Sequence, residues 1–111
     1  MKRIYYSGGS ILTGDAIAEA VLLYASALAK SPLSDVVHIP IVLPGTEGAI
    51  AGLLIGPASQ VMCVPSDEGG DSELIDDELV VELERRTLMI GSPRPVPQSR
   101  EGVVVGADDY E

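Results

Sequence analysis

The sequence predicts an α+β fold, in which a small antiparallel sheet, a meander of three or more strands, packs against one long buried helix. The helix is expected at residues 15–30. Three apolar runs rich in β-branched residues follow it, at 36–43, 49–55 and 60–64, and short turns containing glycine and proline separate them. Because turns this short join neighbouring antiparallel strands, the three runs are expected to pair in sequence order.

The helix expected at residues 15–30 is apolar over most of its circumference. Its polar side chains share one narrow stripe, because steps of four and seven residues return to the same helical face. These side chains are Asp15, Glu19, Ser26 and Lys30. Such a helix needs cover on most sides. The sheet can supply one cover, and a second copy of the chain is the natural candidate for another.

A shorter strand is expected before the helix, at residues 4–6, and the turn Ser7-Gly8-Gly9-Ser10 ends it. Pro40 lies inside the run at 36–43. Proline cannot donate a hydrogen bond to a neighbouring strand, so we expect the strand that contains it to lie at an edge of the sheet.

The segment at residues 74–86 fits two periodicities. Ile75, Leu79 and Leu83 are spaced for a helix, whereas Leu79, Val81 and Leu83 are spaced for a strand. Its acidic start and its arginine pair at the end suit a helix dipole and favour the helix. Residues 87–90 are expected to form a strand. The alternative architecture, a small β-barrel capped by the helix, would follow if 78–90 were one long strand.

A chain of 111 residues is the size of one domain. We expect a single α+β domain at residues 1–91. Residues 92–111 are expected to be a proline-rich extended segment with a candidate final strand at 102–106 and an acidic tail.

The aromatic content is low, with four tyrosines and neither phenylalanine nor tryptophan. Aromatic rings each bury roughly 150–250 Å², so a small domain without them has little apolar surface to bury by itself. Sharing apolar faces with a second copy would offset this shortage. The composition therefore favours a homo-oligomer.

The charge is strongly negative, at −10, with 17 acidic and 7 basic residues. Residues 1–60 carry a net charge of −1 and residues 61–111 carry −9. A negative surface repels phosphate backbones and anionic lipid headgroups, so nucleic acid and membrane surfaces are excluded as expected partners. A basic protein remains an allowed partner.

Two further features indicate a cytoplasmic protein. The least polar stretch, residues 16–29, is about 14 residues long, and a membrane-spanning helix needs ~20. The single cysteine, Cys63, cannot form a disulfide within the chain.

Four residues are candidates for lining a ligand pocket: Tyr5, Tyr6, His38 and Cys63. A cysteine and a histidine are the minimum for a thiol nucleophile, but no third group is placed beside them by a local pattern. A core or edge histidine and an inert buried cysteine are the favoured interpretation, so no catalytic residue is predicted.

An acidic loop at residues 65–73 offers oxygen ligands, with Asp67, Asp71 and Glu73 as weak candidates for a cation. The order of ligands in a calcium-binding EF-hand does not occur. We interpret the loop as solvated, and we expect neither a metal site nor a cofactor.

Three functional hypotheses follow. The first is a non-catalytic cytoplasmic interaction module that self-associates through apolar surface. The second is a small-ligand binder or modest enzyme whose pocket is lined by the four Tyr, His and Cys candidates. The third is an acidic mimic of nucleic acid that occupies a basic partner.

Overall fold

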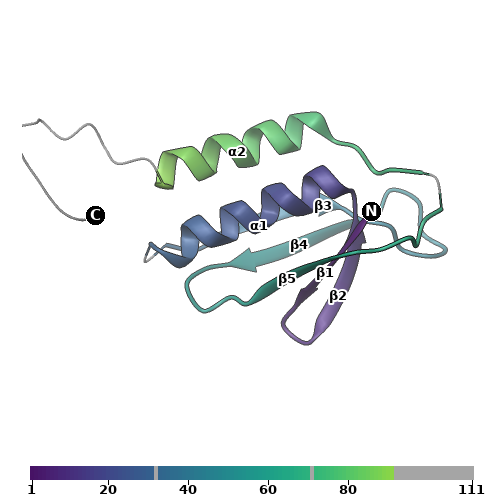
Figure 1. The fold of residues 1–111 in the computed structure, drawn as a ribbon, viewed down its shortest axis with the longest axis horizontal. Helices are drawn as coiled ribbons and strands as arrows, with labels where there is room; N and C mark the ends of the chain where they lie inside the picture. Colours follow the sequence, from purple (N-terminus) through teal and green to yellow (C-terminus); the bar gives the residue numbers. More distant parts are fainter. Residues whose placement is uncertain (32, 71, 92–111) are drawn as a thin grey trace, which may run out of the picture.

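A computed structural model describes residues 1–31, 33–70 and 72–91 and confirms the α+β class, with two helices and two small antiparallel sheets (Figure 1). The elements, in chain order, are β1 (Lys2–Tyr6), β2 (Gly9–Thr13), α1 (Asp15–Ala29), β3 (Asp35–Pro40), β4 (Ile50–Ile55), β5 (Val61–Pro65) and α2 (Asp77–Gly91). The extended segment, candidate strand and acidic tail predicted for 92–111 lie outside the described residues.

The strands form two sheets and not the predicted meander. One sheet has the order β2-β1-β5 and the other pairs β3 with β4. The turn after β4 therefore carries the chain from one sheet to the other, where β5 pairs with β1. In that position Cys63 lies opposite Ile4, on the side of the sheet that faces α1. Burying these side chains against α1 favours this pairing over a third strand beside β4.

The turn between β1 and β2 is tighter than predicted. Only Ser7 and Gly8 form it, with φ values of 54° and 82°. Two central residues with positive φ suit a two-residue hairpin, because the twist of such a turn matches that of its strands. Gly9 and Ser10, expected in the turn, belong to β2 and pair with Tyr6 and Tyr5.

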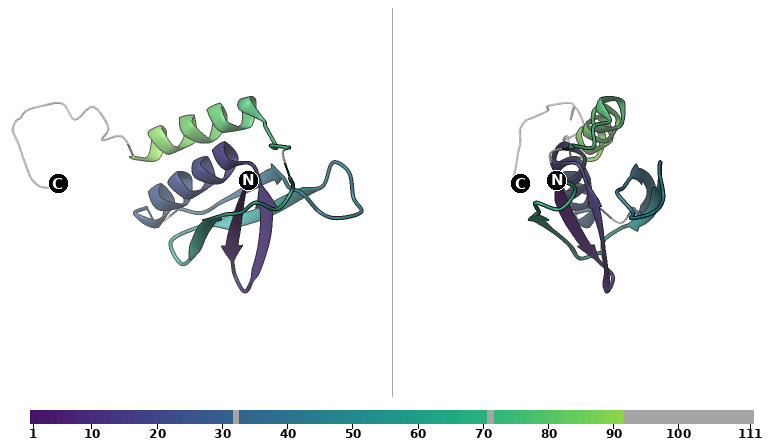
Figure 2. Two further views of the ribbon diagram at one scale, coloured as in Figure 1. Left: turned by 45° about the vertical axis from the view of Figure 1, so that its right-hand side comes forward. Right: turned by 90° about the vertical axis from the view of Figure 1, so that its right-hand side faces the viewer.

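Helix α1 lies between the two sheets and α2 (Figure 2). Its inward residues form the centre of the core: Ile17, Ala18, Ala20, Val21, Tyr24, Ala25 and Leu28 are buried. The prediction of one long buried helix is not confirmed, because α1 leaves Leu22 and Leu23 exposed. The helix favoured at 74–86 is present as α2, which packs against α1.

Helix α2 runs through the residues where a strand was expected. Residues 87–90 continue the helix, which excludes both the predicted strand and the barrel alternative. The helical spacing of the apolar residues in α2 buries Leu83 completely against the core, which favours the helix over a strand. Thr87, despite its β-branched side chain, donates its hydroxyl to the Leu83 carbonyl at 2.8 Å.

Within the described ranges, neither helix has both the length and the apolar character needed to cross a bilayer.

Candidate functional site

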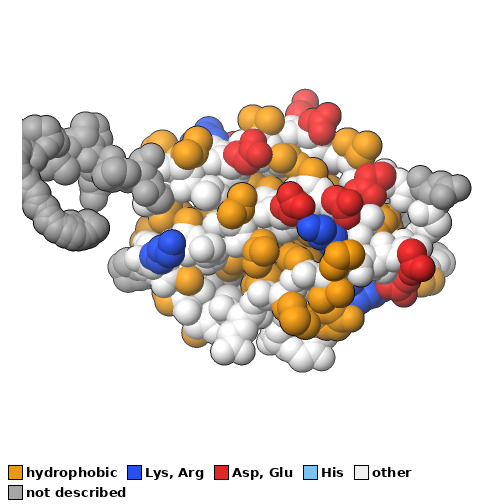
Figure 3. Space-filling model, in the orientation of Figure 1, with side chains coloured by type: hydrophobic (Ala, Val, Ile, Leu, Met, Phe, Trp, Pro, Cys, Tyr) orange, Lys and Arg blue, Asp and Glu red, His pale blue; other side chains and the backbone are white. Residues whose placement is uncertain are grey.

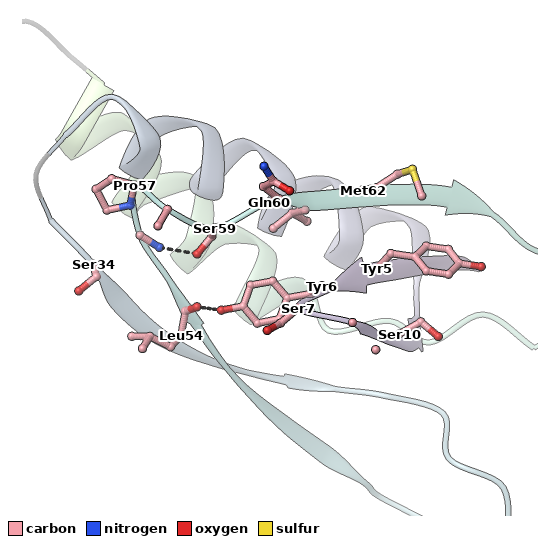
Figure 4. A pocket seen from close by; sticks show the side chains of 15 residues that line it. Tyr5, Tyr6, Ser7, Ser10, Ser34, Leu54, Pro57, Ser59, Gln60 and Met62 are labelled. Atoms are coloured by element: carbon pink, nitrogen blue, oxygen red, sulfur yellow. Dashed lines mark hydrogen bonds between the residues drawn. The ribbon is translucent and has the colours of Figure 1, made fainter.

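An open concavity lies between the tip of the β1–β2 hairpin and the turn that follows β4 (Figure 4). Its volume is about 950 Å³. We call it the hydroxyl pocket, because six hydroxyl side chains line it: Tyr5, Tyr6, Ser7, Ser10, Ser34 and Ser59. Gln60 adds an amide, and Leu54, Pro57 and Met62 add apolar surface.

Three hydrogen bonds shape the wall of the hydroxyl pocket. The Tyr6 hydroxyl donates to the backbone carbonyl of Leu54 and so links the two sheets. The Ser59 Oγ accepts from the Gly56 N–H at 2.9 Å, which fixes the turn after β4. The Ser10 Oγ accepts from the Arg3 guanidinium at 3.1 Å.

The structure brings together only two of the four predicted pocket residues. Tyr5 and Tyr6 line the hydroxyl pocket, whereas His38 and Cys63 do not. Cys63 faces α1, where its thiol lies 3.7 Å from the Ala18 carbonyl oxygen. Burial raises the pKa of the Cys63 thiol, which is opposite to what an activated nucleophile needs.

His38 lies on the exposed face of β3, opposite Gly52 of β4. A Cβ atom added to Gly52 would lie 3.4 Å from two atoms of the His38 ring. The imidazole therefore packs over the glycine backbone on the outside of the β3–β4 sheet.

This exposed side of the two-stranded sheet is the second candidate site, and we call it the outer β3–β4 face. It consists of the outward residues of both strands: Val36, His38, Pro40, Ile50, Gly52 and Leu54. The alternating inward residues join the core. The apolar side chains on the outer face are 49% exposed for Val36, 61% for Ile50 and 59% for Leu54.

A smaller apolar groove runs between α1 and α2 and has a volume of about 280 Å³. Ala20 and Leu23 line it from α1, and Thr87 and Leu88 from α2, with Glu84 at its side. This groove was not predicted, because residues 87–90 were expected to form a strand.

A polar cluster ties α1, β3 and α2 together. The Tyr24 hydroxyl donates to Asp35 Oδ2 at 2.5 Å, and the Arg86 guanidinium donates to the same oxygen at 3.1 Å. The hydrogen bond from Tyr24 lowers the pKa of the Asp35 carboxyl. Arg85 and Arg86 both donate to Glu82 and lower its pKa from 4.5 to about 2. The hydrogen bonds of Asp35 join α1 and α2 to β3, and those of Glu82 lie within α2.

Two of the cation candidates, Asp67 and Glu73, lie within the described residues. Glu73 accepts hydrogen bonds from the Asp15 N–H and from the amino group of Met1, and Asp67 is exposed. Asp71 lies outside the described residues. Among the residues that are described, no three metal-ligating side chains group together.

No protein-family model, no curated protein and no solved structure matches this chain.

Proposed function

We propose that the chain is a non-catalytic cytoplasmic interaction module that self-associates through the outer β3–β4 face. The observation that carries the proposal is the in-register apolar surface on this face. Val36 pairs with Leu54, and Pro40 pairs with Ile50. The free thiol of Cys63 is compatible with a reducing compartment.

The sheet that bears this face gains little stability from its own strands. It has two strands, so each has a strand partner on one side only. An isolated two-stranded sheet is marginal in water. Its inner side is covered by the core, and a partner on its outer side would bury the remaining apolar side chains.

The distribution of charge favours the outer β3–β4 face over other surfaces as the place where a second copy binds. The chain has a net charge of −10, and like charges brought together in an interface repel each other. Figure 3 shows acidic side chains over the helices and the loop region at the right of the molecule. The six residues of the outer β3–β4 face, by contrast, include no carboxylate. Two copies can therefore meet there with the least repulsion.

A two-fold axis would place the same face on both subunits. Six residues are fewer than the roughly 20–30 per side of a standard interface. We therefore expect a weak dimer, which dissociates at micromolar concentration.

Sedimentation equilibrium over a range of concentrations tests the proposal. The chain should move from 11.6 kDa towards twice that mass as its concentration rises. Ile50→Glu and Val36→Glu place a carboxylate on the outer β3–β4 face and should each keep the chain monomeric.

Val81→Glu is the matched control, because Val81 is 63% exposed on α2, away from this face. It should dimerise like the unchanged protein. A chain that stays monomeric at every concentration would overturn the proposal. So would a dimer that survives both substitutions on the outer face.

A further inference from the structure

The hydroxyl pocket is lined by uncharged residues. Charged residues make up 22% of the chain. Of the described residues, fifteen line the pocket, and these include no Asp, Glu, Lys, Arg or His. A concave site of about 950 Å³ lies at the upper end of the range of ligand pockets, which is roughly 300–1,000 Å³.

From this chemistry we infer that the hydroxyl pocket binds a neutral saccharide. An anionic ligand would need Arg or Lys for recognition, and the net charge of the chain would repel it. A hard metal ion such as Ca²⁺ would need carboxylates. A wholly apolar ligand would remove water from the hydroxyl groups without replacing their hydrogen bonds, which is costly. A neutral ligand that carries its own hydroxyl groups avoids all three penalties.

Several polar groups of the pocket are available to such a ligand. The side chains of Ser7, Ser34 and Gln60 line the pocket, and all three residues are exposed. Ser59 uses its oxygen to accept from Gly56, so its hydroxyl proton can be donated to a ligand. A hydroxyl group both donates and accepts, and serines can therefore adapt to the hydroxyl pattern of a sugar.

Tyr5 supplies the apolar contact that a sugar ring also needs. Its side chain is 41% exposed and lies beside Met62, its cross-strand partner, in Figure 4. Aromatic rings combine a large apolar surface with a polar tip. The ring can cover the C–H face of a sugar while the neighbouring hydroxyl groups bind its edge.

The hairpin turn places the Ser7 hydroxyl in the pocket. The two-residue turn requires a positive φ at this position, and Ser7 adopts it with a φ of 54°. Glycine or asparagine would adopt this left-handed conformation at lower cost.

The test is an NMR titration of the ¹⁵N-labelled chain with maltotriose, cellotriose and chitotriose at millimolar concentration. At least one of these neutral sugars should shift the amide signals of residues 5–10 and 54–62. Tyr5→Ala should lower the affinity for that sugar by about tenfold, as expected for the loss of one aromatic contact. A sulfated oligosaccharide should cause no saturable shift at these positions.

Ser7→Gly separates binding from folding. Glycine relieves the backbone at this position, so the variant should be at least as stable as the unchanged chain. Its affinity for the sugar should nevertheless fall by about fivefold, the loss expected for one hydrogen bond.

Ile50 lies outside the pocket lining, so Ile50→Glu should still bind the sugar as a monomer, which distinguishes this inference from the proposal of self-association. If all three sugars leave the pocket signals in place, the inference is wrong. It is equally wrong if a neutral peptide of alanine and serine shifts those signals and the sugars do not, because the site would then recognise an extended chain.

Discussion

At the scale of single residues, the start of α1 depends on the absence of a side chain at Gly14. The segment that follows the acidic loop crosses the helix there. A Cβ atom on Gly14 would lie 1.8 Å from the carbonyl oxygen of Leu74 and 2.9 Å from its carbonyl carbon. These are backbone atoms, so they cannot move aside without displacing the segment and its contact from Glu73 to the Asp15 N–H.

We therefore expect Gly14→Ala to lower the free energy of unfolding by about 1–3 kcal/mol, the usual cost of forcing extra volume into a packed site. Gly9→Ala is the control, because the nearest atom to a Cβ there is 3.9 Å away. Urea unfolding of both variants measures the difference. If Gly14→Ala and Gly9→Ala were equally stable, the segment at Leu74 would not be in close contact with the start of the helix.

The carboxyls of Asp35 and Glu82 predict a loss of stability in acid. Their folded-state pKa values lie below their unfolded values, since Tyr24 donates to Asp35, and Arg85 and Arg86 donate to Glu82. The folded state therefore binds fewer protons than the unfolded state, and protonation favours unfolding. For Glu82 the contribution is present above pH 4.5 and disappears as the pH falls towards about 2.

The midpoint of thermal unfolding should accordingly fall as the pH is lowered through this window. Glu82→Gln removes one of the carboxyls whose pKa is lowered by folding and should make the pH dependence shallower. The Glu82 side chain is 37% exposed, so solvent screening keeps its contribution to the pH dependence of stability small. A variant with the same pH dependence as the unchanged chain would contradict this assignment.

At the scale of the elements, α2 is held by one fully buried side chain at its centre. Leu83 has no exposed surface, and it belongs to the same core cluster as Ile17 and Val21 of α1. Leu83→Ala should lower the free energy of unfolding by about 2–5 kcal/mol. Val81→Ala, on the exposed side of the same helix, should change stability by less than about 0.5 kcal/mol.

Hydrogen exchange locates the effect of Leu83→Ala. If α2 depends on this contact, its amides should lose protection before those of β1 and β5. Uniform loss of protection across the chain would mean that α2 and the sheets unfold as one unit.

The sequence predicted most elements but not how the strands pair. The helix expected at 15–30 and the strands at 49–55 and 60–64 agree closely with α1, β4 and β5, because local periodicity determines them. The meander was wrong because a short turn fixes the distance between two strands but not their pairing. Strand β2 was missed because a two-residue turn leaves Gly9 and Ser10 free to pair, and neither favours a strand by composition.

The pocket was only partly predictable for a related reason. Tyr5 and Tyr6 stand out as aromatic residues in a chain that has few. Two serines of the hydroxyl pocket, Ser7 and Ser59, lie in turns, where serine is ordinary. The other two lie in β2 (Ser10) and just before β3 (Ser34). The contact that brings the two turns together, between Tyr6 and Leu54, spans 48 positions in the chain, and no local pattern reports it.

At the scale of the whole molecule, several carboxylates are already paired within the chain. Glu19 binds Lys2, and Glu68 binds Arg3. Glu82 binds both Arg85 and Arg86. These contacts hold carboxylates against the chain's own cations, and a basic partner would have to compete for them. The pairing weakens the hypothesis of a nucleic-acid mimic relative to association through an apolar face.

Salt distinguishes these two modes of association by the sign of its effect. Two copies with a net charge of −10 each repel one another, and salt screens this repulsion. The Debye length falls from about 30 Å at 0.01 M to about 3 Å at 1 M. Burial of Val36, Ile50 and Leu54 in a dimer involves no ion pair that salt could weaken.

The dimer should therefore become tighter as sodium chloride rises over this range, as measured by sedimentation equilibrium. Ile50→Glu should remain monomeric at every salt concentration, because salt cannot restore the apolar contact. A complex with a basic protein would behave in the opposite way, since its attraction is the quantity that salt screens. A dimer that dissociates as salt is added would be held by ionic contacts, and the outer β3–β4 face would not be its interface.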